Sequence, residues 1–117
     1  HDILLLPGQM LVEHKHNAVG DVPSKMETWQ IRHGSAYFFG EGEATEPMPV
    51  KIPESQIENG GALSRNCKLL EEGELSTLSS IGSWHYIIAG PKGAIISEYA
   101  TPHHPDALKF SNNTIVF

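Results

Sequence analysis

Apolar and polar residues alternate in short runs along this chain, and glycine, proline, asparagine and aspartate separate the runs. Alternation with a period of two is typical of strands with one buried face, and no stretch keeps the three-to-four-residue spacing of an amphipathic helix. The pattern predicts about seven to nine short strands, and therefore an all-β fold, a small antiparallel barrel or sandwich. The clearest runs are residues 3–6, 10–16, 25–33, 36–39, 67–70, 84–88 and 94–99.

Length and composition restrict the class of protein. With 117 residues, the chain is expected to form one domain, residues 1–117. Its longest apolar run is far too short to cross a bilayer, no signal-peptide core is visible, and the single Cys67 builds no disulfide framework, so a cytoplasmic protein is expected. A net charge of −6 disfavours nucleic acid as a partner.

Two histidines separated by one residue form the most informative motif. In an extended strand His14 and His16 point to the same side, because successive side chains alternate between faces. Glu27 falls on the inward face of the next predicted strand, together with Trp29 and Ile31. Imidazoles and a carboxylate are ligands that manganese, iron and zinc accept. The sequence therefore predicts a metal site, with the alternative that two surface histidines alternate by chance.

A third histidine lies near the start of a later predicted strand. His85 follows the turn-forming residues Ser80 and Gly82, and it would complete a set of three histidines and one carboxylate. Four such ligands leave one or two positions of an octahedral ion for substrate or water. Taken without its partners, His85 between two aromatic residues is also typical of a hydrogen-bonded core histidine.

These residues resemble the two motifs of the cupin superfamily. The first motif is matched by glycine, H-x-H, glutamate and glycine, although the spacer between His16 and Glu27 is lengthened to ten residues. The second is matched with one extra residue, and Ser80 stands in place of the usual proline. The lengthened spacer and its surroundings look like the D-lyxose isomerase branch of the cupins. The matching positions are Gly8, His14, His16, Glu27, Gly34, Gly73, Gly82 and His85, with segments 7–9, 13–16, 19–21, 23–28 and 96–101, Arg32 and Asp106.

The resemblance implies a cupin-type antiparallel β-barrel, also called a double-stranded β-helix or jelly roll. It also implies one divalent metal ion, Mn²⁺ in the first place with Zn²⁺, Fe²⁺ or Co²⁺ as alternatives, held by His14, His16, Glu27 and His85. The implied activity is aldose–ketose isomerisation of a sugar such as D-lyxose through an enediol. This chain is shorter than the full-length isomerases of that branch, which carry extra N-terminal structure.

The isomerase reading assigns two more residues to the site. Glu98 is the candidate base, with a solvated strand-end glutamate as the alternative, and Lys25 is the candidate donor to a substrate oxygen, with an exposed lysine as the alternative. Trp29 is expected in the core, or against the sugar as a pocket-lining ring. His33 and the pair His103–His104 are expected outside the metal's coordination shell.

Three functions stay open at this point. The first is the isomerase, favoured by the polar groups Lys25, Glu98 and Asp106; the second is an Fe(II) cupin dioxygenase; the third is a metal-holding sugar-binding module without catalysis. The apolar run 3–6 is a candidate edge strand, through which a homodimer is expected.

Overall fold

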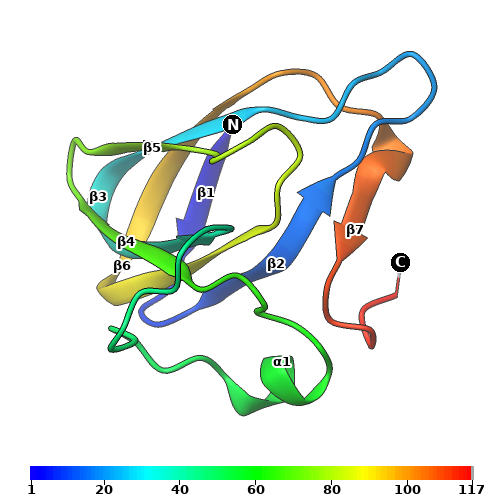
Figure 1. Cartoon of the computed structure of the whole chain (residues 1–117). Helices are drawn as coiled ribbons and strands as arrows, with labels where there is room; N and C mark the ends of the chain where they lie inside the picture. Colours follow the sequence, from blue (N-terminus) through cyan, green and yellow to red (C-terminus); the bar gives the residue numbers. More distant parts are fainter. Residues whose placement is uncertain (117) are drawn as a thin grey trace.

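The computed structural model describes residues 1–116, and nearly all regular structure in them is β-strand. The expected all-β class is therefore confirmed. Helix is limited to one five-residue segment and a single 3₁₀ turn. The elements are β1 (Asp2–Leu5), β2 (Met10–His16), β3 (Glu27–Gly40), α1 (Glu54–Glu58), β4 (Asn66–Glu71), β5 (Leu75–Thr77), β6 (His85–Ala100), η1 (Pro105–Ala107) and β7 (Leu108–Phe110) (Figure 1).

All strand pairs are antiparallel, and the two long strands β3 and β6 form the centre of the sheet. The second half of β3 carries β4 and its first half carries β5, while β2 pairs with the start of β6 and β1 with its end. The sheet therefore has two parts that share β3 and β6. Strand β7 continues one part as the neighbour of β2. Within residues 1–116, no pairing of outer strands closes the sheet.

The two central strands are longer than the sequence predicts. Runs 25–33 and 36–39 are joined into β3, and runs 84–88 and 94–99 are joined into β6. The glycines that were expected to end strands instead allow a bend. Gly34 has a φ of 74°, and a Cβ there would collide with the carbonyl oxygen of Gly93. The register of the β3–β6 pair shifts on either side of Gly34, which is typical of bulges that curve a sheet (Figure 1).

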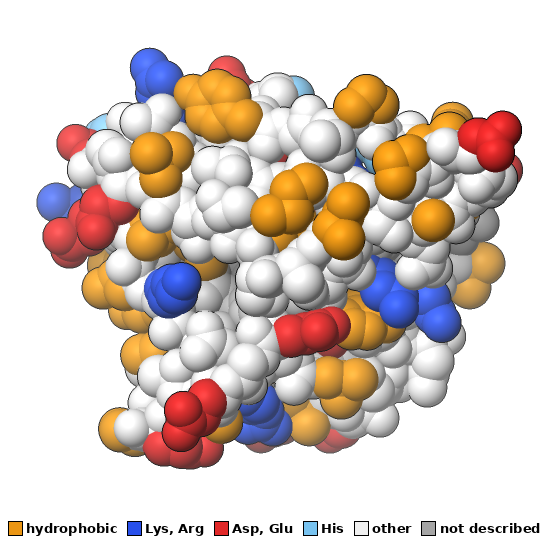
Figure 2. Space-filling model, turned by 45° about the horizontal axis from the view of Figure 1, so that its top comes forward, with side chains coloured by type: hydrophobic (Ala, Val, Ile, Leu, Met, Phe, Trp, Pro, Cys, Tyr) orange, Lys and Arg blue, Asp and Glu red, His pale blue; other side chains and the backbone are white. Residues whose placement is uncertain are grey.

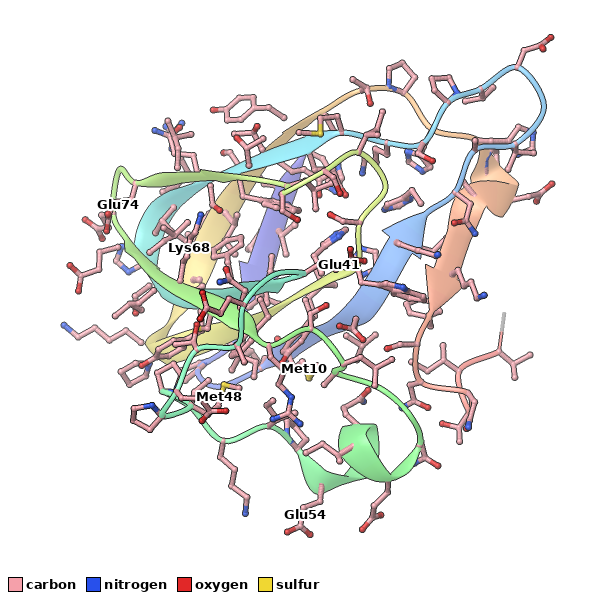
Figure 3. All side chains as sticks on the ribbon, viewed as in Figure 1. Met10, Glu41, Met48, Glu54, Lys68 and Glu74 are labelled. Atoms are coloured by element: carbon pink, nitrogen blue, oxygen red, sulfur yellow. The ribbon has the colours of Figure 1, made fainter. Side chains whose placement is uncertain are left out.

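The core consists of two apolar clusters on opposite faces of β6. Ile87 belongs to the cluster inside the curved sheet with Trp29, Ile31 and Ile96. The neighbouring Tyr86 and Ile88 belong to a second cluster, which loop residues before and after α1 cover. The Tyr86 ring stacks on Phe39 with centroids 4.3 Å apart. Figure 3 labels Met10 and Met48, which pack against this second cluster from β2 and from the loop before α1.

The surface carries scattered apolar and charged side chains. Figure 2 shows orange apolar groups and blue basic groups at separate places on one face. Leu4 on β1 and Leu6, the residue directly after this strand, are 70% and 72% exposed. The helices of the described chain are all too short and too polar to span a membrane.

Candidate metal centre

Three histidines from two neighbouring strands converge in the interior. Strand β2 ends with His14 and His16, and β6 begins with His85, which stands opposite His14 in the strand register. One ligand atom from each ring can be chosen so that all lie within 4.8 Å of one another. The three residues are 8%, 6% and 3% exposed, so the reading of two chance surface histidines is wrong.

Glu27 adds a carboxylate to this cluster from the start of β3. Its Oε2 lies 3.2 Å from Nε2 of His85, and its Oε1 lies 3.9 Å from Nε2 of His16. The residue is 1% exposed. The structure thus brings the three sequence-predicted histidines together and places the fourth predicted ligand, Glu27, beside two of them, although the four residues come from three different strands.

Hydrogen bonds orient two of the rings. Nδ1–H of His14 donates to the carbonyl oxygen of Val12 at 2.8 Å, and Nδ1–H of His85 donates to that of Ser83 at 3.0 Å. Because a carbonyl only accepts, Nδ1 carries the proton in both rings and Nε2 keeps a free lone pair. In metal sites, a histidine ligand is usually oriented by such a hydrogen bond from its second ring nitrogen.

Burial keeps the rings neutral. It lowers the pKa of His14 to about 4, with a further contribution from His85, and lowers the pKa of His16 to about 3, with a further contribution from Lys25. Burial also lowers the pKa of His85. At neutral pH a cation therefore displaces no proton from these imidazoles.

A buried carboxylate oxygen supports the fit of a cation. Within the described residues 1–116, Oε2 of Glu27 is fully buried and makes no hydrogen bond. An unsatisfied buried carboxylate oxygen is costly, and a cation at the centre of the cluster would satisfy it. Three imidazole nitrogens and one carboxylate oxygen form a mixed donor set that suits manganese, iron, cobalt or zinc.

Lys25 joins the cluster to a second carboxylate. Its Nζ lies 2.9 Å from Oε1 of Glu27 and donates a 2.8 Å hydrogen bond to Oε1 of Glu98. Nε1–H of Trp29 donates to the other oxygen of Glu98 at 3.2 Å. Lys25 and Glu98 are 4% and 8% exposed, so the readings of an exposed lysine and a solvated glutamate are both wrong.

The charges of this group stabilise one another. Burial alone would raise the pKa of Glu98, but the hydrogen bond and charge of Lys25 outweigh it and hold that pKa below its usual range. Burial likewise opposes the charge on Lys25, yet its bonds to Glu98 and Glu27 raise the Lys25 pKa. Burial raises the pKa of Glu27 against the effect of Lys25. One ammonium therefore serves two carboxylates, and Glu98 is the more readily ionised.

A pocket of about 290 Å³ opens onto these groups. Its lining combines two carboxylates, the Lys25 ammonium and imidazoles with apolar side chains. A small ligand with several hydroxyl groups would meet ionised donors and acceptors there. The lining residues are His1, Ile3, Leu11, His14, His16, Lys25, Glu27, Glu98, His103, Leu108 and Phe110.

The other polar residues singled out in the sequence lie elsewhere. His33 is exposed and pairs with Glu72 at 3.2 Å. Asp106 is also exposed and lies 3.7 Å from His104, so its expected contribution to the site is not seen. His103 is not among the converging ligands, but its ring centroid lies 4.8 Å from that of His16.

Sequence reasoning missed the supporting roles of two residues. Trp29 is buried in the core, as expected, but its hydrogen bond to Glu98 was not predicted. Glu13 directly precedes the histidine motif on β2, and its carboxylate accepts hydrogen bonds from the backbone N–H groups of Leu63 and Ser64, each at 2.8 Å. The sequence around Glu13 gives little indication of this role, because the partner Leu63 lies 50 residues further along the chain.

Comparison with known proteins gives relatives of one kind. The chain is 34% identical over 100 residues to the D-lyxose/D-mannose isomerase of Thermosediminibacter oceani, which covers 86% of this chain and 54% of that protein. It is 32% identical to the D-lyxose ketol-isomerase of Cohnella laeviribosi and 29% identical to that of a Thermofilum species, again over 86% of this chain and 53% and 54% of theirs. The chain spans about half the length of these curated relatives. No protein-family model matches it.

Proposed function

Because this chain is D-lyxose isomerase-like in sequence, we propose that it acts as a metal-dependent aldose–ketose isomerase on D-lyxose or a closely similar sugar. One observation carries the proposal. Three buried neutral imidazoles converge beside Glu27 and the Lys25–Glu98 ion pair, and one pocket is lined by two of these histidines together with Glu27, Lys25 and Glu98.

The metal would be held through Nε2 of His14 and His85, a nitrogen of His16 and the carboxylate of Glu27. Mn²⁺ is the proposed ion, with Fe²⁺, Co²⁺ and Zn²⁺ as alternatives for the same donor set. When bound, such an ion supplies a Lewis acid that polarises a carbonyl and stabilises negative charge on oxygen. Nearby positive charge would also favour the ionised form of Glu27, whose pKa burial raises.

Glu98 is the proposed base. Isomerisation removes the proton from C2 of an aldose, gives an enediol, and returns a proton to C1 as the ketose forms. The ionised carboxylate of Glu98 would accept the C2 proton and deliver it to C1, since its lowered pKa keeps it ready to accept at neutral pH. Trp29 and Lys25 hold its two oxygens in place.

Lys25 is the proposed donor to the sugar. An ammonium group has three N–H bonds, and two are directed to Glu27 and Glu98. The third would donate to a substrate oxygen as negative charge develops there. Its raised pKa keeps the group charged during this step.

A metal-holding sugar-binding module without turnover is the second candidate. It is supported by the length of the chain, which spans about half of the isomerases it resembles. An Fe(II) dioxygenase is less well supported, because a buried lysine between two carboxylates faces the pocket.

The proposal extends to architecture. We propose that the curved sheet forms a cupin-type barrel and one domain, since Glu27 and His85 meet although they lie at opposite ends of the β3–β6 pairing. We also propose a homodimer through β1, which pairs with β6, carries the exposed Leu4 and is followed directly by the exposed Leu6. Sedimentation equilibrium at micromolar concentration tests the dimer, and a monomer there would contradict it.

The activity test is ketose formation. The protein is stripped with a chelator, loaded with Mn²⁺ and incubated with D-lyxose or D-mannose, and the ketose product is measured against the metal-free protein. Turnover that depends on Mn²⁺ supports the isomerase. Sugar binding without turnover supports the binding module, and bound iron with oxygen consumption supports the dioxygenase.

A further inference from the structure

The three histidines of the candidate metal centre differ in how their second nitrogen is held. Nδ1–H of His14 and of His85 each donates to a backbone carbonyl two residues earlier in the chain. Nδ1 of His16 is equally buried, but within residues 1–116 it has no hydrogen-bond partner. If His16 binds a cation through Nε2, its Nδ1 carries a proton that needs an acceptor.

One group close enough to supply that acceptor is another imidazole. The ring centroids of His16 and His103 lie 4.8 Å apart, with an angle of 57° between the planes. A hydrogen bond of about 2.9 Å between two imidazole nitrogens places the ring centroids roughly 5 Å apart. The observed spacing therefore requires only a turn of the His103 side chain about its own bonds.

The backbone holds His103 at this place from both sides. Thr101 N–H donates to the carbonyl of Met26 at 3.0 Å, and Met26 N–H donates to Oγ1 of Thr101 at 2.8 Å. On the other side, Asn17 N–H donates to the carbonyl of Ala107 at 2.9 Å. Met26 and Asn17 are chain neighbours of Glu27 and His16, so both anchors fix the loop to the metal centre itself.

We propose that His103 is the positioning residue for His16: its imidazole accepts the hydrogen bond from Nδ1–H of His16 and orients that ring for metal binding. The inference rests on the proposed metal-dependent function and adds a member to its site. His103 lies on the pocket wall, so this orientation depends on a solvent-accessible side chain, unlike that of His14 and His85.

Metal affinity gives the first test. Titration of the chelator-stripped protein with Mn²⁺ should show that His103→Ala binds at least about tenfold more weakly than the wild type. His103→Gln keeps a side-chain acceptor and should bind more tightly than His103→Ala. His104→Asn is the matched control: it removes the adjacent imidazole and retains an acceptor for Asp106 N–H, and its affinity should equal that of the wild type.

A spectroscopic readout separates positioning from a general structural effect. In Zn²⁺-loaded protein labelled with ¹⁵N-histidine, Nδ1–H of His16 should give a slowly exchanging proton signal in the wild type and in His104→Asn, and should lose it in His103→Ala. Wild-type affinity in His103→Ala, or an unchanged His16 signal, would overturn the inference. If metal binds as described and no sugar is converted, only the proposed activity fails; if no metal binds, both fail.

Discussion

Oε2 of Glu27 and Nε2 of His85 lie 3.2 Å apart, although the two residues stand at opposite ends of the β3–β6 pairing. Glu27 pairs with Ala100 at one end, and Gly40 pairs with His85 at the other. A straight strand of the fourteen residues from Glu27 to Gly40 would separate the ends by about 40 Å. The bend of the two strands therefore brings the two ends together, and the candidate metal centre occupies the place where they meet.

Removing the charge of Glu98 should stop turnover without releasing the metal. Glu98→Gln keeps one acceptor oxygen, for either Lys25 Nζ or Trp29 Nε1–H, and an amide accepts no proton at neutral pH, so kcat should fall by about 10²- to 10⁴-fold. Steady-state rates and metal content are measured on the same Mn²⁺-loaded sample. Glu72→Gln, at an exposed position, serves as the control. Full activity in Glu98→Gln would show that another group is the base.

Loss of either histidine of the β2 pair should abolish metal retention. His14→Ala and His16→Ala each remove one donor from a cluster in which every member is buried. Metal content after extensive dialysis is the measurement, with His33→Ala, whose ring is exposed, as the control. Retention of stoichiometric metal by both variants would place the ion elsewhere.

The metal-free protein should become less stable as pH falls from about 6.5 to about 4. Histidines titrate at 6.5 in the unfolded chain, whereas burial lowers the pKa of folded His14 to about 4 and of His16 to about 3. The unfolded state binds more protons in this window, so acid favours it, and each of the two rings contributes a loss on the order of 3 kcal/mol. Urea unfolding at several pH values measures it. His14→Gln, with one buried titrating ring fewer, should show a smaller slope, and a pH-independent stability would contradict the assignment.

Glu13 should be a stabilising residue rather than a catalytic one. Its carboxylate is 1% exposed and accepts two backbone hydrogen bonds from the loop after α1. Glu13→Ala leaves both N–H groups without this acceptor and should lower the free energy of unfolding by about 3 kcal/mol. Chemical denaturation measures this, and the exposed Glu58→Ala is the control. A change no larger than that of the control would show that the loop is held by other contacts.

Gly34 should not tolerate a side chain. Its φ is 74°, and a Cβ would collide with the carbonyl oxygen of Gly93 on the neighbouring strand. Gly34→Ala should therefore destabilise the fold by about 2 kcal/mol or more, measured as a shift of the thermal midpoint. Gly40→Ala, on the same strand with open space around it, should have a much smaller effect. Equal midpoints for the two variants would refute the role of Gly34 in the bend.

Local patterns in the sequence were enough for the fold class and for part of the site. Strand alternation predicted β2 with the correct bounds and placed His14 and His16 on one face, because both facts depend only on neighbouring residues. The inward face of Glu27, Trp29 and Ile31 was also confirmed, since all three are buried.

The remaining features depend on distant partners. The contact between Lys25 and Glu98 joins residues 73 positions apart, and it follows from the register that sets Trp29 opposite Glu98. Resemblance to a family suggested these residues, whereas spacing alone did not. Gly34 and Gly90 were predicted to separate strands, yet each lies inside a continuous strand and permits close approach of the neighbouring strand. Whether a glycine ends a strand or permits such an approach depends on the residue opposite it in the sheet.

The bend in β6 controls the distance between the two ends of the candidate site. His85 and Glu98 belong to the same strand, on either side of Gly90 and Gly93, so the curvature between them sets the span from the ion-binding end to the proposed base. Sequence changes around these glycines would therefore alter the dimensions of the pocket while every polar group that lines it stays the same.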